Sequence, residues 1–252
     1  MLKIDQLSKT YKNGTAALTD VSFSVQEGEF VVILGKSGSG KSTLMRCINR
    51  LVEPSSGKIF LDGEEVTGAS PKRLRELRKK TGMIFQQYNL ISRYSVQLNT
   101  LMGRLASTSS ITSMMNCFSE EDVAHSRQVL DRLGLSDKYF HRSEELSGGQ
   151  QQRVGLARAL MQQPEIILAD EPVSSLDPAS SRQIMELLAE FNEKDGVTIL
   201  CNLHLPALAQ EFGSRILVLS EGQIVHDGPA GNLNEMELSS LYAEGGLPDN
   251  LF

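Results

Sequence analysis

The stretch Gly35-Lys36-Ser37-Gly38-Ser39-Gly40-Lys41-Ser42 follows the apolar run Phe30–Leu34 and precedes a helix-like segment, Thr43–Ile48. It matches the pattern G-x-x-x-x-G-K-[ST] at every fixed position, in the strand-to-helix setting that this pattern requires. The glycines let successive backbone N–H groups converge on a phosphate, and the N-terminus of the following helix adds positive potential. The alternative is a Gly/Ser-rich turn that matches by chance. Because a strand and a helix flank it, we interpret the stretch as a nucleoside triphosphate site.

Within this phosphate loop, Lys41 is expected to reach the β- and γ-phosphates. Ser42 is expected to bind Mg²⁺ through its hydroxyl. The predicted nucleotide-binding residues of the loop are Gly35, Lys36, Ser37, Gly38, Ser39, Gly40, Lys41, Ser42 and Thr43.

Length and charge limit the class of protein. A chain of 252 residues can bury a sizeable core in one large domain or two smaller ones. The formal net charge of −6 argues against a broad nucleic-acid-binding surface, which needs a basic excess. The basic stretch Lys72–Lys80 is interrupted by acidic and apolar residues, so we interpret it as a solvated helix face.

Cysteine usage and hydropathy bear on the compartment. Cys47, Cys117 and Cys201 are far apart and form no C-x-x-C pair, so neither a metal site nor a disulfide framework is indicated. Scattered cysteines are typical of a reducing compartment. The N-terminus lacks the apolar core of a signal peptide, and no apolar run approaches the roughly 18–20 residues that cross a bilayer. We therefore expect a soluble, cytoplasmic chain.

Strand-like and helix-like segments alternate along most of the chain, which predicts an α/β fold. Helical periodicity replaces the strands between residues 88 and 159, with helices expected over Val96–Leu105, Glu120–Leu133 and Gln150–Met161. We interpret this region as a helical insertion into a single domain, 1–252, whose core takes in residues 1–87 and 160–230. The polar stretch Ser107–Ser113 is expected to form a surface loop, and the tail 231–252 to carry one short helix.

A second site element follows the apolar strand Ile166–Ala169. Triphosphate hydrolysis needs a carboxylate near Mg²⁺ and a group that positions water. Asp170, at the end of the strand, could hold the Mg²⁺ shell through a water, and Glu171 could accept a proton from the attacking water. Two acids after a strand also commonly cap a turn, but the phosphate loop favours the catalytic interpretation.

The octet Leu146-Ser147-Gly148-Gly149-Gln150-Gln151-Gln152-Arg153 is a second candidate anion site, because a serine and two glycines stand at a predicted helix start. A helix N-cap explains the glycines alone. The whole octet, just before an Asp-Glu strand end, resembles the signature sequence of ATP-binding cassette (ABC) ATPases. The resemblance covers nearly the whole chain, and it implies a P-loop core with an antiparallel β subdomain and a helical subdomain insertion.

The resemblance also implies roles for single residues. Tyr11 matches an aromatic residue that stacks on adenine, the alternative being a core tyrosine. Gln86 matches a glutamine that links Mg²⁺ and the attacking water to the helical insertion, and Ser174–Asp177 matches a loop that passes between two copies of the domain. His204 matches the switch histidine at the γ-phosphate, the alternative being a structural histidine. The implied metal-binding residues are Ser42, Gln86 and Asp170.

In this family two copies form a head-to-tail dimer. The resemblance implies that each ATP, with Mg²⁺, lies between the phosphate loop of one copy and Ser147, Gly148, Gly149 and Gln150 of the other. Implied partners are multi-spanning permease subunits and, indirectly, an extracytoplasmic solute-binding protein. The expected location is the cytoplasmic face of the inner membrane.

Finer features resemble the phosphonate-importer branch of the family: Phe85–Leu90, the serine-rich insertion and Asn202-Leu203-His204. Two segments depart from the family pattern. Gln97–Thr100 lacks an acid near the implied permease-docking surface, and Leu205-Pro206 follows His204. An importer of polar amino acids or methionine stays open as an alternative. So does a non-transport ABC switch protein, although such proteins usually carry two cassettes or a long coiled coil.

Overall fold

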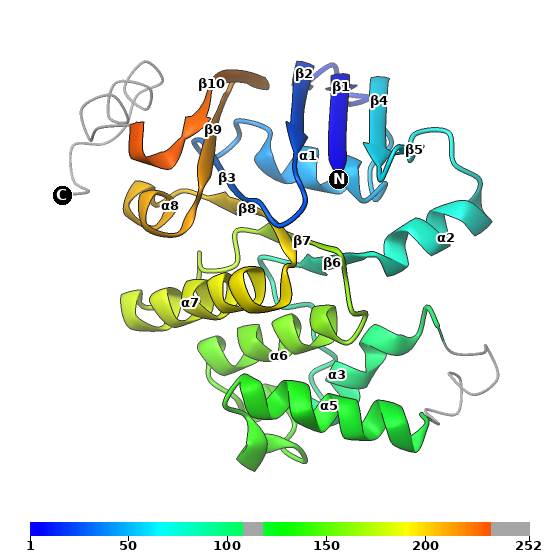
Figure 1. Cartoon of the computed structure of the whole chain (residues 1–252), viewed down its shortest axis with the longest axis vertical. Coiled ribbons are helices and arrows are strands. Elements are labelled where there is room, and N and C mark those ends of the chain that lie inside the picture. The colour runs from blue at the N-terminus through cyan, green and yellow to red at the C-terminus, as the bar shows by residue number, and fades with distance from the viewer. Residues whose placement is uncertain (108–117, 233–252) are drawn as a thin grey trace.

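The computed structural model describes residues 1–107 and 118–232, which form two β-sheets and a set of helices (Figure 1). Most of the predicted loop 107–113 and nearly all of the tail 231–252 lie outside the described residues, and so does Cys117. None of the helices in the described part of the chain combines the length and the apolarity that a membrane span requires.

The smaller sheet is antiparallel in the strand order β2-β1-β4-β5. Its strands are β1 Leu2–Thr10, β2 Ala16–Val25, β4 Ser56–Leu61 and β5 Glu64–Glu65. Buried and exposed residues alternate along β2, with Val21, Phe23 and Val25 facing inward. This pattern leaves one face of the sheet in solvent, as antiparallel sheets allow.

The larger sheet has the order β10-β9-β3-β8-β7-β6, with only β10 antiparallel to its neighbour. Its strands are β3 Phe30–Leu34, β6 Thr81–Ile84, β7 Ile166–Asp170, β8 Thr198–Leu203, β9 Arg215–Ser220 and β10 Gln223–Pro229. Every residue of β3, β6, β7 and β8 is buried, because helices or the other sheet cover both faces. The carboxyl ends of these parallel strands meet at one edge, where ligands bind in open α/β sheets.

Helices fill the space between the sheets and cover the other face of the larger sheet. Helix α1, Lys41–Ile48, packs between the sheets, where Leu44 and Met45 join a cluster with residues of β1, β3 and β7. The remaining helices are α2 Pro71–Lys79, α3 Val96–Leu101, α5 Glu120–Arg132, α6 Gly148–Leu160, α7 Pro178–Asp195 and α8 Pro206–Phe212. Helices α3, α5 and α6 form the lower, helical half in Figure 1.

The first predicted helix of the insertion is shorter than expected. Helix α3 ends at Leu101, and a 3-10 turn, Met102–Arg104, replaces the rest of the predicted Val96–Leu105. A Cβ at Gly103 would lie 2.2 Å from the carbonyl oxygen of Arg158, so the chain approaches α6 here as only a glycine can. The predicted helix Gln150–Met161 instead begins at Gly148, because Ser147 acts as its N-cap.

Candidate active site

The phosphate loop connects β3 to α1 as the sequence predicted. Gly38 and Gly40 adopt φ of 82° and 107°, which side-chain-bearing residues rarely adopt. A Cβ at Gly35 would lie 2.3 Å from the carbonyl oxygen of Leu219, and one at Gly40 would lie 2.4 Å from that of Ala17. The loop therefore lies close against β9 of the larger sheet and β2 of the smaller sheet. No side chain caps the N-terminus of α1 at Gly40, so its first-turn N–H groups are available to an anion.

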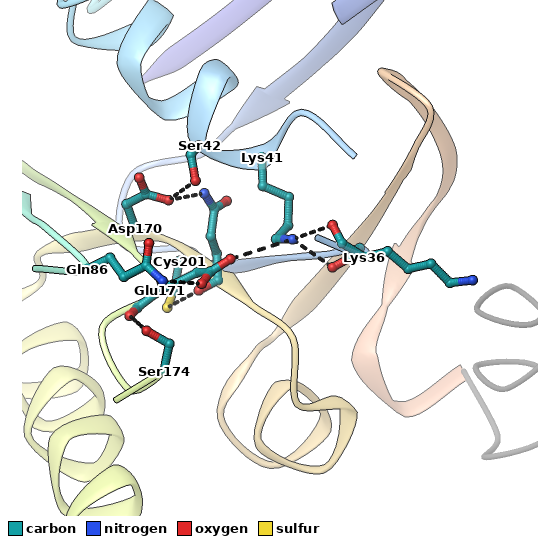
Figure 2. Close-up of polar contacts among 10 residues, drawn as sticks. Lys36, Lys41, Ser42, Gln86, Asp170, Glu171, Ser174 and Cys201 are labelled. Atoms are coloured by element: carbon teal, nitrogen blue, oxygen red, sulfur yellow. Dashed lines mark hydrogen bonds and ion pairs between the residues drawn. The ribbon is translucent and has the colours of Figure 1, made fainter. Parts of the chain in front are cut away.

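Lys41 lies inside this loop. Its side chain is 3% exposed, and Nζ donates hydrogen bonds to the carbonyl oxygens of Gly35 at 2.7 Å and Lys36 at 2.9 Å. Glu171 Oε1 lies 3.8 Å from the same nitrogen (Figure 2). Burial lowers the pKa of Lys41 below its ordinary value, although Glu171 and Asp170 act in the opposite direction. The loop thus encloses a buried cation that an incoming phosphate would stabilise.

Ser42 and Asp170 join α1 to the end of β7. Ser42 Oγ donates a hydrogen bond of 2.9 Å to Asp170 Oδ1, and Asp170 is 3% exposed. The same carboxylate oxygen accepts a hydrogen bond of 2.9 Å from Asn202 Nδ2 of β8. Residues 128 and 32 positions away from Asp170 in the chain thus fix its carboxylate at the sheet edge.

Glu171 leaves the strand in the left-handed conformation, with φ of 51°. Gln86, two residues beyond β6, donates a hydrogen bond of 3.1 Å from Nε2 to Glu171 Oε2. Since Gln86 also lines a groove at the helical half, it connects the carboxylate to that surface. A glutamate between a buried ammonium and an amide can accept a proton from a water that lies against a bound phosphate.

Tyr11 lies at the rim of the site. Its hydroxyl is 3.2 Å from Thr43 Oγ1 of α1, and the ammonium of Lys9 lies 5.3 Å from the ring centroid. The residue is 36% exposed, so it is not a core tyrosine. An exposed ring beside the phosphate loop suits a flat base.

Other predicted site residues do not join this network. Ser147 begins α6 in the helical half, where its hydroxyl and the Gln150 side chain form a capping box. A Cβ at Gly148 would lie 2.9 Å from Tyr88 Oη, and one at Gly149 would lie 3.2 Å from Ser180 Oγ. His204 follows β8 and is exposed. Helix α6, which Ser147 caps, lies in the helical half, whereas the phosphate loop follows β3 of the larger sheet (Figure 1).

The oxygen atoms of Ser42 and Asp170 suit Mg²⁺. Within 1–107 and 118–232, no cluster of three His, Cys, Asp or Glu side chains could hold a metal by itself. Mg²⁺ is commonly held by one or two protein oxygens together with phosphate oxygens and water. Ser42 and Asp170 supply such oxygens within hydrogen-bond distance of each other. The residues therefore fit Mg²⁺ that arrives with a nucleotide.

The segment Gln97–Thr100, which departs from the family pattern, lies in α3. Asn99 is 1% exposed and holds the preceding loop, accepting from Ile91 N at 2.8 Å and donating to Ile91 O at 3.0 Å. Thr100 donates to Val96 O of its own helix. These two residues are structural. Gln97 contacts Ser126 of α5 at 3.5 Å.

One residue of the network was not predicted. Asn202 was noted only as part of a resemblance, yet it donates directly to Asp170. The available signal was a polar residue two positions before His204, after the apolar residues Ile199 and Leu200. Its partner depends on the pairing of β7 with β8, which the sequence does not show.

The profile of the ABC transporter family matches residues 18–174, which include the phosphate loop and Glu171. The chain belongs to the ABC transporter family. Members of this family bind and hydrolyse ATP. The family explains why a phosphate loop and a second glycine-rich helix start occur in one chain.

Relatives within this ABC family span the whole chain. Phosphonates import ATP-binding protein PhnC 3 of Halalkalibacterium halodurans is 46% identical over 251 residues, which cover 100% of this chain and 97% of the relative. PhnC 1 of Rhodopseudomonas palustris is 50% identical over 244 residues, covering 97% and 90%. A dimeric ATP-binding cassette solved in a post-hydrolysis state with ADP and Pi superposes with a TM-score of 0.80 at 36% identity, covering 91% of this chain and 99% of that one.

Proposed function

We propose that this chain is the ATP-hydrolysing subunit of an importer for phosphonate or a related phosphorus compound. The observation that carries the proposal is the network that joins Lys41 to Glu171, Gln86 to Glu171, and Ser42 to Asp170 across the edge of the larger sheet. Each of these side chains has the chemistry that phosphoryl transfer to water requires.

We infer the following roles from the network and, for His204 and Tyr11, from the family resemblance. The ammonium of Lys41 balances charge on the β- and γ-phosphates, and the backbone N–H groups at the start of α1 hold them. Glu171 accepts the proton of the attacking water, while Gln86 and His204 orient that water. Ser42, Asp170 and Gln86 would hold Mg²⁺, which would offset the phosphate charge. Tyr11 stacks on the adenine.

The site is completed by a second copy of the chain. Ser147, Gly148, Gly149 and Gln150 lie at the N-terminus of α6, separated from the phosphate loop of their own chain. We propose that they bind the γ-phosphate held by the other copy. The dimeric state of the solved relative with ADP and Pi supports this arrangement.

The helical half, residues 88–159, is proposed to dock the permease. A groove of about 560 Å³ lies beside it and is lined by Gln86, Tyr88, Leu90 and Gln151 among others. Because Gln86 is bonded to Glu171, a partner in this groove would sense hydrolysis. The ATPase would then act at the cytoplasmic face of the inner membrane, with a solute-binding protein on the other side.

The cargo is tested by growth. A strain that lacks this gene and any redundant system should fail to grow on phosphonate as sole phosphorus source and should recover with the intact gene. Lys41→Ala should not restore growth, whereas Lys72→Ala, on the exposed face of α2, should. Normal growth of the deletion strain would remove the phosphonate assignment.

A further inference from the structure

Asn202 occupies a position of β8 that suits an apolar side chain. Strands β8 and β7 are parallel with Asn202 in register with Asp170, so both side chains lie on the face that packs against α1. Leu200, two residues earlier on the same face, belongs to the apolar cluster around α1. Asn202 is 0% exposed. A buried amide is unfavourable unless its polar atoms are hydrogen-bonded, so this asparagine needs a reason.

One reason for the buried amide is that Asn202 binds the Asp170 carboxylate. Nδ2 donates to Asp170 Oδ1 at 2.9 Å, and the assignment of this amide is unambiguous because a carboxylate only accepts. Ser42 Oγ donates to the same oxygen. Two donors on separate elements, β8 and α1, therefore hold one carboxylate oxygen and restrict rotation of the group.

A second reason concerns the carbonyl oxygen of the Asn202 amide. Asn202 Oδ1 is buried and has no hydrogen-bond partner among the described residues. A residue kept only for packing would not carry an unpaired oxygen here, since an apolar side chain would fill the position without that cost. An unpaired acceptor beside Asp170 and Ser42 suits a donor that arrives with the ligand, such as a water bound to a metal.

We propose that Asn202 is a positioning residue that orients the Asp170 carboxylate toward the divalent cation of the bound nucleotide. The inference rests on the proposed ATP site. The proposal predicts different effects on the affinity for the cation and on the affinity for the nucleotide. Asn202 acts on the cation through Asp170, whereas the loop 35–42 holds the phosphates. Loss of its amide should therefore weaken the contribution of the metal and leave metal-free nucleotide binding unchanged.

The test compares Asn202→Val with the unaltered chain, using a fluorescent, non-hydrolysable ATP analogue. The Kd of the analogue is measured in EDTA. In separate samples without EDTA, Mn²⁺ is titrated to follow the metal-dependent change in fluorescence. We expect an unchanged Kd in EDTA and a Mn²⁺ midpoint raised about 10-fold or more, as for other residues that orient a metal ligand. The temperature of unfolding should not fall, because valine suits a buried strand.

Leu200→Val is the matched control, since it alters the same face of β8 and should leave the Mn²⁺ midpoint unchanged. Asn202→Thr keeps a hydrogen-bond donor and should give a smaller shift; it decides the matter by the same two titrations if the valine variant does not fold. A wild-type midpoint in Asn202→Val would overturn the proposal. Equal losses with and without Mn²⁺, together with a lower temperature of unfolding, would show a structural role only. If the unaltered chain binds no analogue, the proposed ATP site fails instead.

Discussion

Asp170 and Glu171 are neighbours, yet the backbone gives their carboxylates different surroundings. Asp170 is the last residue of β7 and accepts hydrogen bonds from Ser42 of α1 and from Asn202 of β8. Glu171 adopts φ of 51° and reaches Lys41 and Gln86 instead. This left-handed conformation is uncommon for a residue with a side chain, and it turns Glu171 away from the direction of Asp170. One backbone turn thus separates a candidate metal-binding acid from a candidate base.

Replacing Glu171 tests its role as the base. Glu171→Gln removes the proton acceptor while keeping the size of the side chain, so ATP hydrolysis should fall about 10²-fold or more. Release of Pi from MgATP measures this rate. Glu165→Gln is the control, because that carboxylate is exposed and pairs with Lys80 at the start of β7. Full turnover by Glu171→Gln would contradict the assignment.

The lowered pKa of Lys41 predicts a pH dependence of nucleotide binding. Burial favours the neutral amine in the free protein, whereas bound phosphates favour the charged form. As pH rises through the lowered pKa toward 10.5, binding must take up a proton, so the affinity for ATP in EDTA should fall. Fluorescence titrations from pH 7 to pH 10.5, with circular dichroism to monitor folding, would measure it. An affinity for ATP that does not change between pH 7 and pH 10.5 would contradict the prediction.

At the scale of the elements, glycines lie at the N-termini of both α1 and α6, but the two N-termini are capped differently. Helix α1 has no side-chain cap at Gly40, whereas Ser147 and Gln150 cap α6 reciprocally. A free N-terminus suits direct phosphate binding within the chain. The capped N-terminus of α6 is stable without a ligand, which suits a surface that meets its ligand only when a second copy approaches.

Ser147→Ala separates these two uses of α6. Loss of the cap should lower the free energy of unfolding by about 1 kcal/mol, measured by urea denaturation. It should also prevent ATP-dependent dimerisation. Ser119→Ala removes the equivalent cap of α5, so it should cost similar stability and leave dimerisation intact. If both variants dimerise normally, Ser147 does not contact the nucleotide of a second copy.

Across the whole molecule, local patterns predicted the strands and helices that carry the phosphate loop and the acidic pair. An apolar run followed by acids identified β7 with Asp170 and Glu171, and the glycine spacing identified the loop before α1. The family resemblance alone indicated that Gln86 belongs to the site, and its hydrogen bond to Glu171 is seen only in the structure. Catalytic roles for these residues remain predictions.

Features that depend on contacts distant in sequence could not be predicted. The bond between Asn202 and Asp170 requires the register of β8 on β7, which no local pattern encodes. The early end of α3 depends on the close approach of Gly103 to α6. The sequence shows a polar residue or a glycine at each position, but only the packed structure shows what it meets.

We propose that each phosphate loop forms half of an ATP site, which residues 147–150 of a second copy complete. The most direct test is the mass of Glu171→Gln in solution with ATP and Mg²⁺, measured by light scattering after size exclusion. We predict twice the monomer mass with two ATP retained per dimer, and a monomer when nucleotide is removed. A monomer that retains ATP would contradict the account.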